Sequence, residues 1–504
     1  MILSKDNLKF VATDKVAVPN EQIFDLPERV LQFGTGVLLR GLPDYFIDKA
    51  NREGVFNGRV AVVKSTGGNT SEFDAQDALY TLCVRGIENG QLVSENIISS
   101  AISRVIAAEK DWQAILDIAK SDTLQLVVSN TTEVGIQYVE ESIESNPPTS
   151  FPAKLLAVLY ERFKTFNGDN SKGLVIVATE LIPDNGTKLG EIVLKLAHYN
   201  KLQANFIAWL ASANTFCNSL VDRIVPGKPD AATIQALQAE LGYEDALLSM
   251  TEPYRLWAIE GGKNVADVLS FATVDEGVII AEDIEIYREL KVRLLNGTHT
   301  LSSGIAFLLG IDTVKNAMTN ELMVNYIETL MATEIAPAIP YEVDKKQSDA
   351  FANSVKDRFV NPSIEHFWTS IAFQYTMKMK IRILPLLLNY YKIFNQVPAH
   401  IALGFAAYLA FSRAQREENG LYFGLDNGAS YRLNDDSAPY LFEKYNQNPN
   451  EFVEQVLADE NIWGVDLTQL AGFIPEVKTL YLDIINQGAT ATLSKFLATE
   501  LKEA

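Results

Sequence analysis

The stretch LQFGTGVLLRG, residues 31–41, places two glycines directly after a strand-like run and directly before a helical one. Gly34 permits the tight turn that this change of direction needs, and Gly36 lets the backbone approach a pyrophosphate at the N-terminus of the following helix. The third glycine of the G-x-G-x-x-G pattern would fall at position 39, which is Leu39. The loop therefore favours a dinucleotide-binding turn, and a strand-to-helix turn with nothing bound is the alternative.

The segments around this loop alternate between strand and helix, which predicts parallel βαβ units. Strands are expected at 29–36, 59–65, 124–130 and 173–180, with helices at 110–120 and 147–163. After about residue 285 the pattern predicts long helices instead, at 287–310, 320–336, 365–392, 398–416 and 476–502. We expect an α/β N-terminal Rossmann-type domain over residues 1–284 and a mostly α-helical substrate and catalytic domain over residues 285–504.

Charge and cysteine content narrow the possible partners. The 504 residues carry a formal net charge of −21, which disfavours binding to nucleic acid or to an anionic membrane but permits a small anionic ligand. The two cysteines cannot form a disulfide framework, and no apolar run approaches the length of a membrane span. We expect a cytoplasmic monomer or small homo-oligomer that acts on a small molecule.

A second stretch, KVRLLNGTHT at 291–300, places Lys291, Asn296 and His299 at the start of an apolar helical run. On an α-helix Asn296 would lie roughly 140° from Lys291 and His299 roughly 80°, so all three can face one concave site. Hydride transfer to a carbonyl creates an alkoxide-like oxygen that needs a proton and hydrogen-bond donors. Desolvation lowers the pKa of a lysine, so a lysine in an apolar pocket can transfer a proton near neutral pH. Alternatively, all three residues have structural roles: the lysine extends its ammonium to solvent, the asparagine caps a helix, and the histidine packs in the core.

Two further strand ends bear on the cofactor. The second strand ends VVKSTGG, so Lys64, Ser65 and Thr66 stand where an acidic residue would bond the adenosine ribose, and Lys64 could favour a 2′-phosphate. The run SNTTEVG, 129–135, is expected to line the nicotinamide side. There Asn130 and Thr132 would donate hydrogen bonds, and Glu133 would lie at the strand end or act as a helix N-terminal carboxylate.

These motifs together resemble the polyol-specific long-chain dehydrogenase/reductases, the mannitol dehydrogenase family. K-x-x-x-x-N-x-x-H matches its catalytic signature, FCNSLVDRIVP (216–226) its N-x-x-V-D-R-I-x-P segment, and RFVNPSIEH (358–366) its R-F-x-N-P motif. The resemblance implies a zinc-free, NAD-dependent oxidoreductase with Lys291 as acid/base, Asn296 and His299 beside it, and Asp222 at the substrate. It also implies a cofactor loop made by Phe33, Gly34, Thr35, Gly36, Val37 and Arg40. The four histidines have no i, i+4 pairing, so no metal site is expected.

Other stretches depart from the mannitol branch. ATELIPDNG (178–186) replaces its S-C-D-N run and puts Leu181 where an oxyanion-binding asparagine stands. ELIPDNG resembles a branch that acts on hexuronate-derived sugar acids, and so do STGGNTSEFDAQDALYTLCVRG (65–86), SNTTEVGI (129–136), LNGTHT and SIAFQYTMKMKIRILPLLL (370–388). The carboxylate of such a substrate needs a local cation. KMKIR (378–382) offers Lys378 and Arg382 one helical turn apart, with Lys380 and Arg40 as further candidates and a solvated helix face as the alternative.

The family's substrate-contacting lysine maps to Lys378, whereas the arginine of the mannitol branch maps to Ser370. Two competing functions remain open at this point. One is a dehydrogenase of the same family for another sugar acid or a neutral polyol, and the other is a dinucleotide-binding sensor without catalysis.

Overall fold

The computed structural model describes residues 1–65, 67–131, 134–426 and 428–503. The chain divides into two compact units. The first comprises Met1–Gly86 and Gln91–Ile284, and the second comprises Ile87–Gly90 and Glu285–Ala504. Among the described residues, no helix combines the length and apolar composition needed to cross a bilayer.

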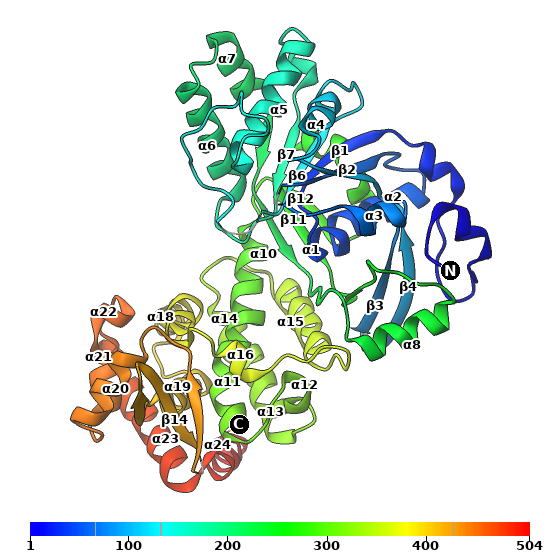
Figure 1. The fold of residues 1–504 in the computed structure, drawn as a ribbon. Helices are drawn as coiled ribbons and strands as arrows, with labels where there is room; N and C mark the ends of the chain where they lie inside the picture. Colours follow the sequence, from blue (N-terminus) through cyan, green and yellow to red (C-terminus); the bar gives the residue numbers. More distant parts are fainter. Residues whose placement is uncertain (66, 132–133, 427, 504) are drawn as a thin grey trace. The chain divides into compact units, whose positions relative to one another are not determined.

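The first unit is built on a six-stranded parallel sheet in the order β5-β2-β1-β6-β7-β8; its central strands are labelled in Figure 1. Its strands are β1 (Glu28–Phe33), β2 (Arg59–Lys64), β5 (Ile102–Ala107), β6 (Leu126–Ser129), β7 (Val175–Ala178) and β8 (Thr215–Cys217). The order reverses between β1 and β6, and ligands of doubly wound sheets bind at the carboxyl ends of strands at such a point. The predicted Rossmann-type domain is confirmed.

Strand residues alternate between two cores because successive side chains point to opposite faces of the sheet. Leu31 and Val127 belong to one core, whereas their neighbours Val30 and Val128 belong to the other. Burial on both faces explains why these strands are continuous apolar runs. The helices that cover the two faces include α4 (Trp112–Ala119), α5 (Phe151–Thr165) and α6 (Asn185–Tyr199) on the first, and α2 (Pro43–Arg52) on the second.

Two smaller sheets complete the first unit. One has the order β10-β3-β4, with β10 (Ser249–Thr251), β3 (Tyr80–Glu88) and β4 (Gln91–Ser99), and Figure 1 shows the long ribbon of β3 and β4. The other has the order β12-β11-β9, with β12 (Val278–Ala281), β11 (Leu256–Glu260) and β9 (Ser219–Asp222).

The second unit is mostly helical, as predicted. Its core surrounds α19 (Ala399–Ser412), in which every residue from His400 to Ser412 is buried, as expected for a helix that is apolar all round. Other helices in this core include α11 (Thr298–Leu308), α13 (Glu321–Thr329) and α23 (Phe473–Gln487). A three-stranded antiparallel sheet, which the sequence did not predict, follows α19: β13 (Arg416–Glu418), β14 (Leu421–Asp426) and β15 (Ala429–Leu433).

Two predicted helices are interrupted. The segment 365–392 is broken by Gln374, whose φ of 54° is left-handed, so α16 (Trp368–Ile371) is separate from α17 (Tyr375–Lys378) and α18 (Leu384–Phe394). The segment 476–502 is divided at Gly488, with φ 83°, between α23 and α24 (Ala489–Glu503). Both predictions of a single helix were wrong because one residue in each segment has positive φ.

Three helices of the second unit change to π geometry over one turn: η5 (Lys291–Gly297), η6 (Leu330–Ile335) and η7 (Met379–Ile383). A π turn bonds residue i to residue i+5 rather than i+4, and such turns are frequent at functional sites. Two of these turns, η5 and η7, contain residues predicted to be functional.

Candidate active site

The glycine loop lies at the carboxyl end of β1. Gly34 has φ 131°, and a Cβ atom there would meet Leu39 Cδ1 at 2.8 Å and the Asn130 carbonyl oxygen at 2.9 Å. Gly36 has no atom within 4 Å of such a position, which leaves space for a pyrophosphate to approach the backbone. Leu39 is fully buried and packs below the turn, which explains why the third glycine is absent.

Two residues expected at the cofactor have other roles in the structure. The Phe33 side chain is fully buried and packs against Phe151 in the core, so only its backbone reaches the loop. The Arg40 guanidinium is buried and donates to the Leu247 carbonyl at 2.6 Å. This placement argues against a contact of Arg40 with a phosphate or a carboxylate, and we leave it out of the proposed site. Thr35 and Val37 are partly exposed.

At the end of β6, one carboxylate that the sequence analysis missed organises the turn. Buried Glu180 accepts hydrogen bonds from the Ser129 hydroxyl at 3.1 Å and from the Thr131 amide and hydroxyl, each at 2.9 Å. The Asn130 amide donates to the Thr179 carbonyl and hydroxyl oxygens, both at 3.0 Å. Both of its hydrogens therefore serve the fold, and the expected donation from Asn130 to a nicotinamide is not supported.

The remaining predicted site residues of the first unit lie, in sequence, near the ends of β2, β6 and β9. Thr132, Glu133 and Thr66 lie outside the described residues. Lys64 Nζ donates to the Asn69 carbonyl at 2.9 Å, so it is held by the loop that follows β2. Asp222 is buried at the end of β9.

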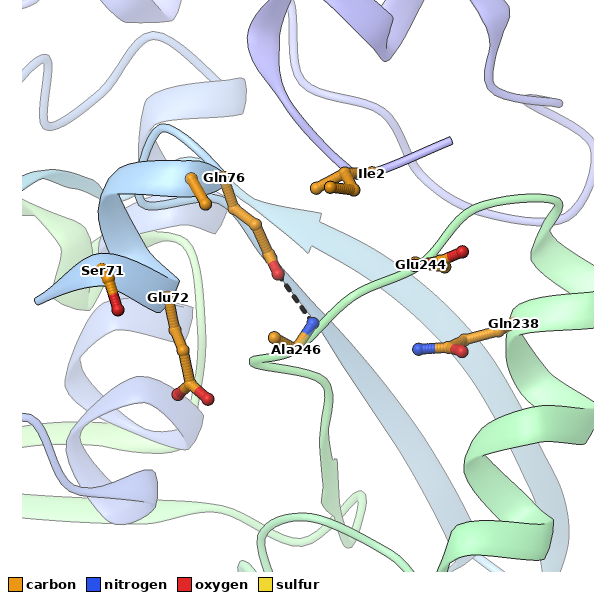
Figure 2. Close-up of a pocket in the computed structure, with 8 residues that line it drawn as sticks. Ile2, Ser71, Glu72, Gln76, Gln238, Glu244 and Ala246 are labelled. Carbon is orange, nitrogen blue, oxygen red and sulfur yellow. Dashed lines mark hydrogen bonds between the residues drawn. The ribbon is translucent and has the colours of Figure 1, made fainter.

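A pocket of about 450 Å³ lies elsewhere in the first unit (Figure 2). The pocket is lined by Ile2, Ser71, Glu72, Ala75, Gln76, Gln238, Glu244 and Ala246. Gln76 Oε1 is already occupied by the Ala246 amide at 2.6 Å. With two carboxylates and no cation among these residues, the pocket does not suit a pyrophosphate, and no predicted site residue lines it.

In the second unit, π geometry changes the relationship between Lys291 and Asn296. They are five residues apart within η5, and a π turn brings residues five apart onto the same side of the helix. The separation of roughly 140° expected for an α-helix is therefore wrong. Both side chains are partly exposed, whereas His299, in the first turn of α11, is buried.

His299 lies among aromatic rings. It stacks on Phe359 with centroids 4.4 Å apart and meets His366 edge to face at 5.0 Å and Trp368 at 6.1 Å. Burial, followed by the nearby His366, Arg358, Arg382 and Lys378, lowers the pKa of His299 well below its usual value. Burial and the charges of Lys378 and Arg358 also lower the pKa of His366. Both imidazoles are therefore neutral near pH 7.

Three cations converge beside these imidazoles. Burial, and next the charge of Arg382, lowers the pKa of Lys378 to about 8, against an opposing effect of Asp435. Lys378 Nζ donates to the Ile371 carbonyl at 2.8 Å. Burial lowers the pKa of Arg382 to about 10, and its Nη1 donates to Thr300 Oγ1 at 3.1 Å. The third cation is Arg358, which is 6% exposed.

The structure therefore brings together His299, Lys378 and Arg382, which the sequence predicted, and adds Arg358 and His366, which it did not assign. Arg358 and His366 are the first and last residues of the motif RFVNPSIEH, and the motif was the only signal for them in the sequence. Of the other histidines, His198 is exposed, and His400 is buried with its backbone amide donating to Glu334 Oε1 at 2.8 Å. Among the residues described, no group of three His, Cys, Asp or Glu side chains is arranged to hold a metal ion.

Comparison with known proteins identifies the family and the fold of this chain. Residues 28–272 match the family model of the mannitol dehydrogenase Rossmann domain, and residues 283–485 match that of the mannitol dehydrogenase C-terminal domain. An altronate oxidoreductase of Bacillus subtilis (strain 168) is 39% identical over 479 residues, which cover 93% of this chain and 95% of the relative. An altronate oxidoreductase of Pectobacterium carotovorum subsp. carotovorum (strain PC1) is 37% identical over 483 residues, covering 93% and 97%.

Two solved structures share the fold over nearly the whole chain. The ternary complex of Pseudomonas fluorescens mannitol 2-dehydrogenase with NAD and D-mannitol has a TM-score of 0.69 at 23% identity, covering 99% of this chain and 100% of that one. A D-sorbitol dehydrogenase in substrate-free form has a TM-score of 0.79 at 20% identity, covering 98% and 100%.

Proposed function

Because the chain belongs to the mannitol dehydrogenase family, we propose that it is an NAD-dependent, metal-independent oxidoreductase that reduces D-tagaturonate to D-altronate. The reaction is a reversible hydride transfer at a CH–OH carbon, in the breakdown of hexuronates. Relatives named altronate oxidoreductase, which match over more than nine-tenths of this chain, support the choice of substrate.

The observation that carries the proposal is the group of cations beside His299. All four charged or titratable groups that lower its pKa are basic: His366, Arg358, Arg382 and Lys378. This concentration of positive charge stands out in a chain of net charge −21. A sugar acid presents one carboxylate, and charge-assisted hydrogen bonds from arginine and lysine are the strongest means of holding it. A neutral polyol offers no carboxylate to these cations.

Three residues of the second unit have separate roles in the proposed reaction: proton transfer, hydrogen bonding to the oxygen, and orientation of the substrate. Bound NADH would supply the hydride that adds to the keto carbon. As the carbonyl oxygen gains negative charge, the Lys291 ammonium transfers a proton to it and the Asn296 amide donates a hydrogen bond. Neutral His299 orients the substrate by hydrogen bonding, since its ring is not available as a cation. In the reverse direction, neutral Lys291 removes the proton from the hydroxyl of altronate.

For the cofactor we propose NAD held at the carboxyl ends of β1 and β6. Gly36 leaves the backbone of the loop open to a pyrophosphate, and Thr35 and Val37 flank it. Family membership favours NAD, whereas Lys64 at the end of β2 mildly favours NADP.

One assay tests this proposal against its alternatives. Purified protein is mixed with NADH or NADPH and with D-tagaturonate, D-fructuronate or D-fructose, and cofactor oxidation is followed. We expect the highest kcat/KM with NADH and tagaturonate. Preference for fructuronate would assign a different sugar acid, preference for fructose would make the enzyme a polyol dehydrogenase, and oxidation of neither cofactor would support the sensor.

A further inference from the structure

Arg293 lies between Lys291 and Asn296 in sequence, yet its buried side chain reaches the other functional helix of the second unit. Its Nε and Nη2 donate to the Glu289 carboxylate at 2.8 and 3.1 Å. Its Nη1 donates to the backbone carbonyls of Ile381 and Arg382, both at 2.8 Å. One guanidinium thus joins the turn that bears Lys291 to the turn that bears Arg382.

One of the accepting carbonyls, that of Ile381, lies where the helix cannot supply its usual donor. Pro385, in the first turn of α18, has no N–H, so the α-helical bond to the Ile381 carbonyl cannot form. The preceding turn is π-helical, with the Leu384 amide bonded to the Met379 carbonyl. Arg293 supplies the donor that Pro385 cannot supply to the Ile381 carbonyl.

The two helices are also joined in the opposite direction. The Arg382 guanidinium donates to the Thr300 hydroxyl at 3.1 Å, and that hydroxyl donates to the Asn296 carbonyl at 2.7 Å. Arg293 therefore holds the backbone of Arg382, while the side chain of Arg382 contacts Thr300 in the helix that follows Asn296. Loss of the backbone contact leaves the Arg382 side chain free to shift relative to the reacting groups.

We propose that Arg293 is a positioning residue that fixes the turn bearing Arg382, directly after Lys378, and thereby sets the affinity for the carboxylate of the substrate. The proposal rests on the proposed function. Only the planar fork of an arginine can serve a carboxylate and two carbonyls at once, whereas the compact ammonium of lysine cannot span both sets of acceptors.

The test compares Arg293→Lys with Arg162→Lys. Arg162 is a buried arginine of the first unit whose guanidinium also donates to backbone carbonyls, those of Ala119, Ser121, Leu124 and Lys172. For Arg293→Lys we expect KM for tagaturonate to rise roughly 10- to 100-fold, as for a misplacement of about 1 Å, with kcat and the KM for NADH changed much less. For Arg162→Lys we expect a lower melting temperature and an unchanged KM for tagaturonate.

Hydrogen exchange gives a second measurement that does not depend on the substrate. In Arg293→Lys, amides of residues 379–388 should exchange faster than in the unaltered protein, and Arg162→Lys should leave them unchanged. Unaltered exchange there, or a lowered melting temperature with an unchanged KM for tagaturonate, would overturn the proposal. If the unaltered enzyme does not reduce tagaturonate, the proposed function fails, and the exchange measurement alone decides the role of Arg293.

Discussion

Phe359 lies flat against His299, with ring centroids 4.4 Å apart and ring planes 13° from parallel. The stacking buries the imidazole, and this burial is the main reason that its pKa falls well below the usual value. A neutral imidazole can both donate and accept a hydrogen bond, which suits it to orient a sugar hydroxyl. In the proposed mechanism, this leaves Lys291 as the proton donor.

The first prediction concerns stability at acid pH. In the unfolded chain His299 titrates near pH 6.5, whereas the folded state binds the proton only at lower pH. Its contribution to stability is therefore full above about pH 6.5 and is lost below it, by up to about 1.4 kcal/mol per pH unit. His299→Gln should flatten the decline in the free energy of unfolding between about pH 6.5 and 5.5, measured by urea denaturation.

The exposed His198 provides the control, because His198→Gln should leave that decline unchanged. His366 contributes in the same direction, so the slope in His299→Gln should shrink rather than vanish. An undiminished slope in His299→Gln would mean that His299 takes up its proton as readily in the folded protein as in the unfolded chain.

The second prediction concerns substrate selectivity. Lys378→Ala should lose roughly 10- to 150-fold in kcat/KM with tagaturonate, since a hydrogen bond to a charged group contributes about 1.5–3 kcal/mol. The loss with a neutral ketose should be much smaller. Lys380→Ala, two residues along the same helix, is the matched control and should affect both substrates little. Equal losses on both substrates in Lys378→Ala would show that Lys378 is structural.

The third prediction concerns the pH dependence of carboxylate binding. The pKa of Lys378 is about 8, so its ammonium is charged below that pH and loses its proton as the pH rises through it. The kcat/KM for tagaturonate should therefore decline above about pH 8, and this component should be absent in Lys378→Ala. Steady-state rates between pH 6.5 and 9.5 test this, and an identical decline in Lys378→Ala would assign the titration to another group.

The fourth prediction compares the two glycines of the cofactor loop. Gly34→Ala should destabilise the protein, because φ 131° disfavours a side chain and the new Cβ would meet both Leu39 and Asn130. Gly36→Ala meets no atom within 4 Å and should keep its melting temperature, yet bind NADH more weakly because the methyl group occupies the approach to the backbone. Differential scanning fluorimetry and NADH fluorescence titration measure both effects, and normal NADH affinity in Gly36→Ala would remove the loop from the cofactor site.

Much of the fold could be predicted because its signals are local. The parallel strands are continuous β-branched runs, and the turn after β1 needs a glycine at position 34 whatever surrounds it. The π turns could not be predicted, because hydrophobic periodicity assumes regular α-helical spacing. The spacing of Lys291 and Asn296 predicted a separation of roughly 140° on an α-helix, and the π turn makes that angle wrong.

The supporting residues were missed for a different reason. Glu180 acts on the turn after β6 from 49 residues away, and Arg293 acts on the carbonyls of Ile381 and Arg382 from 88 and 89 residues away. No local pattern encodes such pairings, so only the folded structure reveals them. Arg40 was expected at the cofactor because its neighbours in sequence are loop residues, whereas in the structure its guanidinium is buried and donates to the Leu247 carbonyl.

The central claim is that Lys291 transfers the proton, and single-turnover oxidation of NADH by Lys291→Ala with tagaturonate tests it most directly. The variant should keep the melting temperature and the NADH affinity of the unaltered enzyme, while the chemical step falls by about 10²–10⁴-fold. Asn296→Ala provides the comparison, with an expected loss of about 10²–10³-fold and a largely unmoved inflection in the pH profile. A nearly normal single-turnover rate in folded Lys291→Ala would contradict the mechanism.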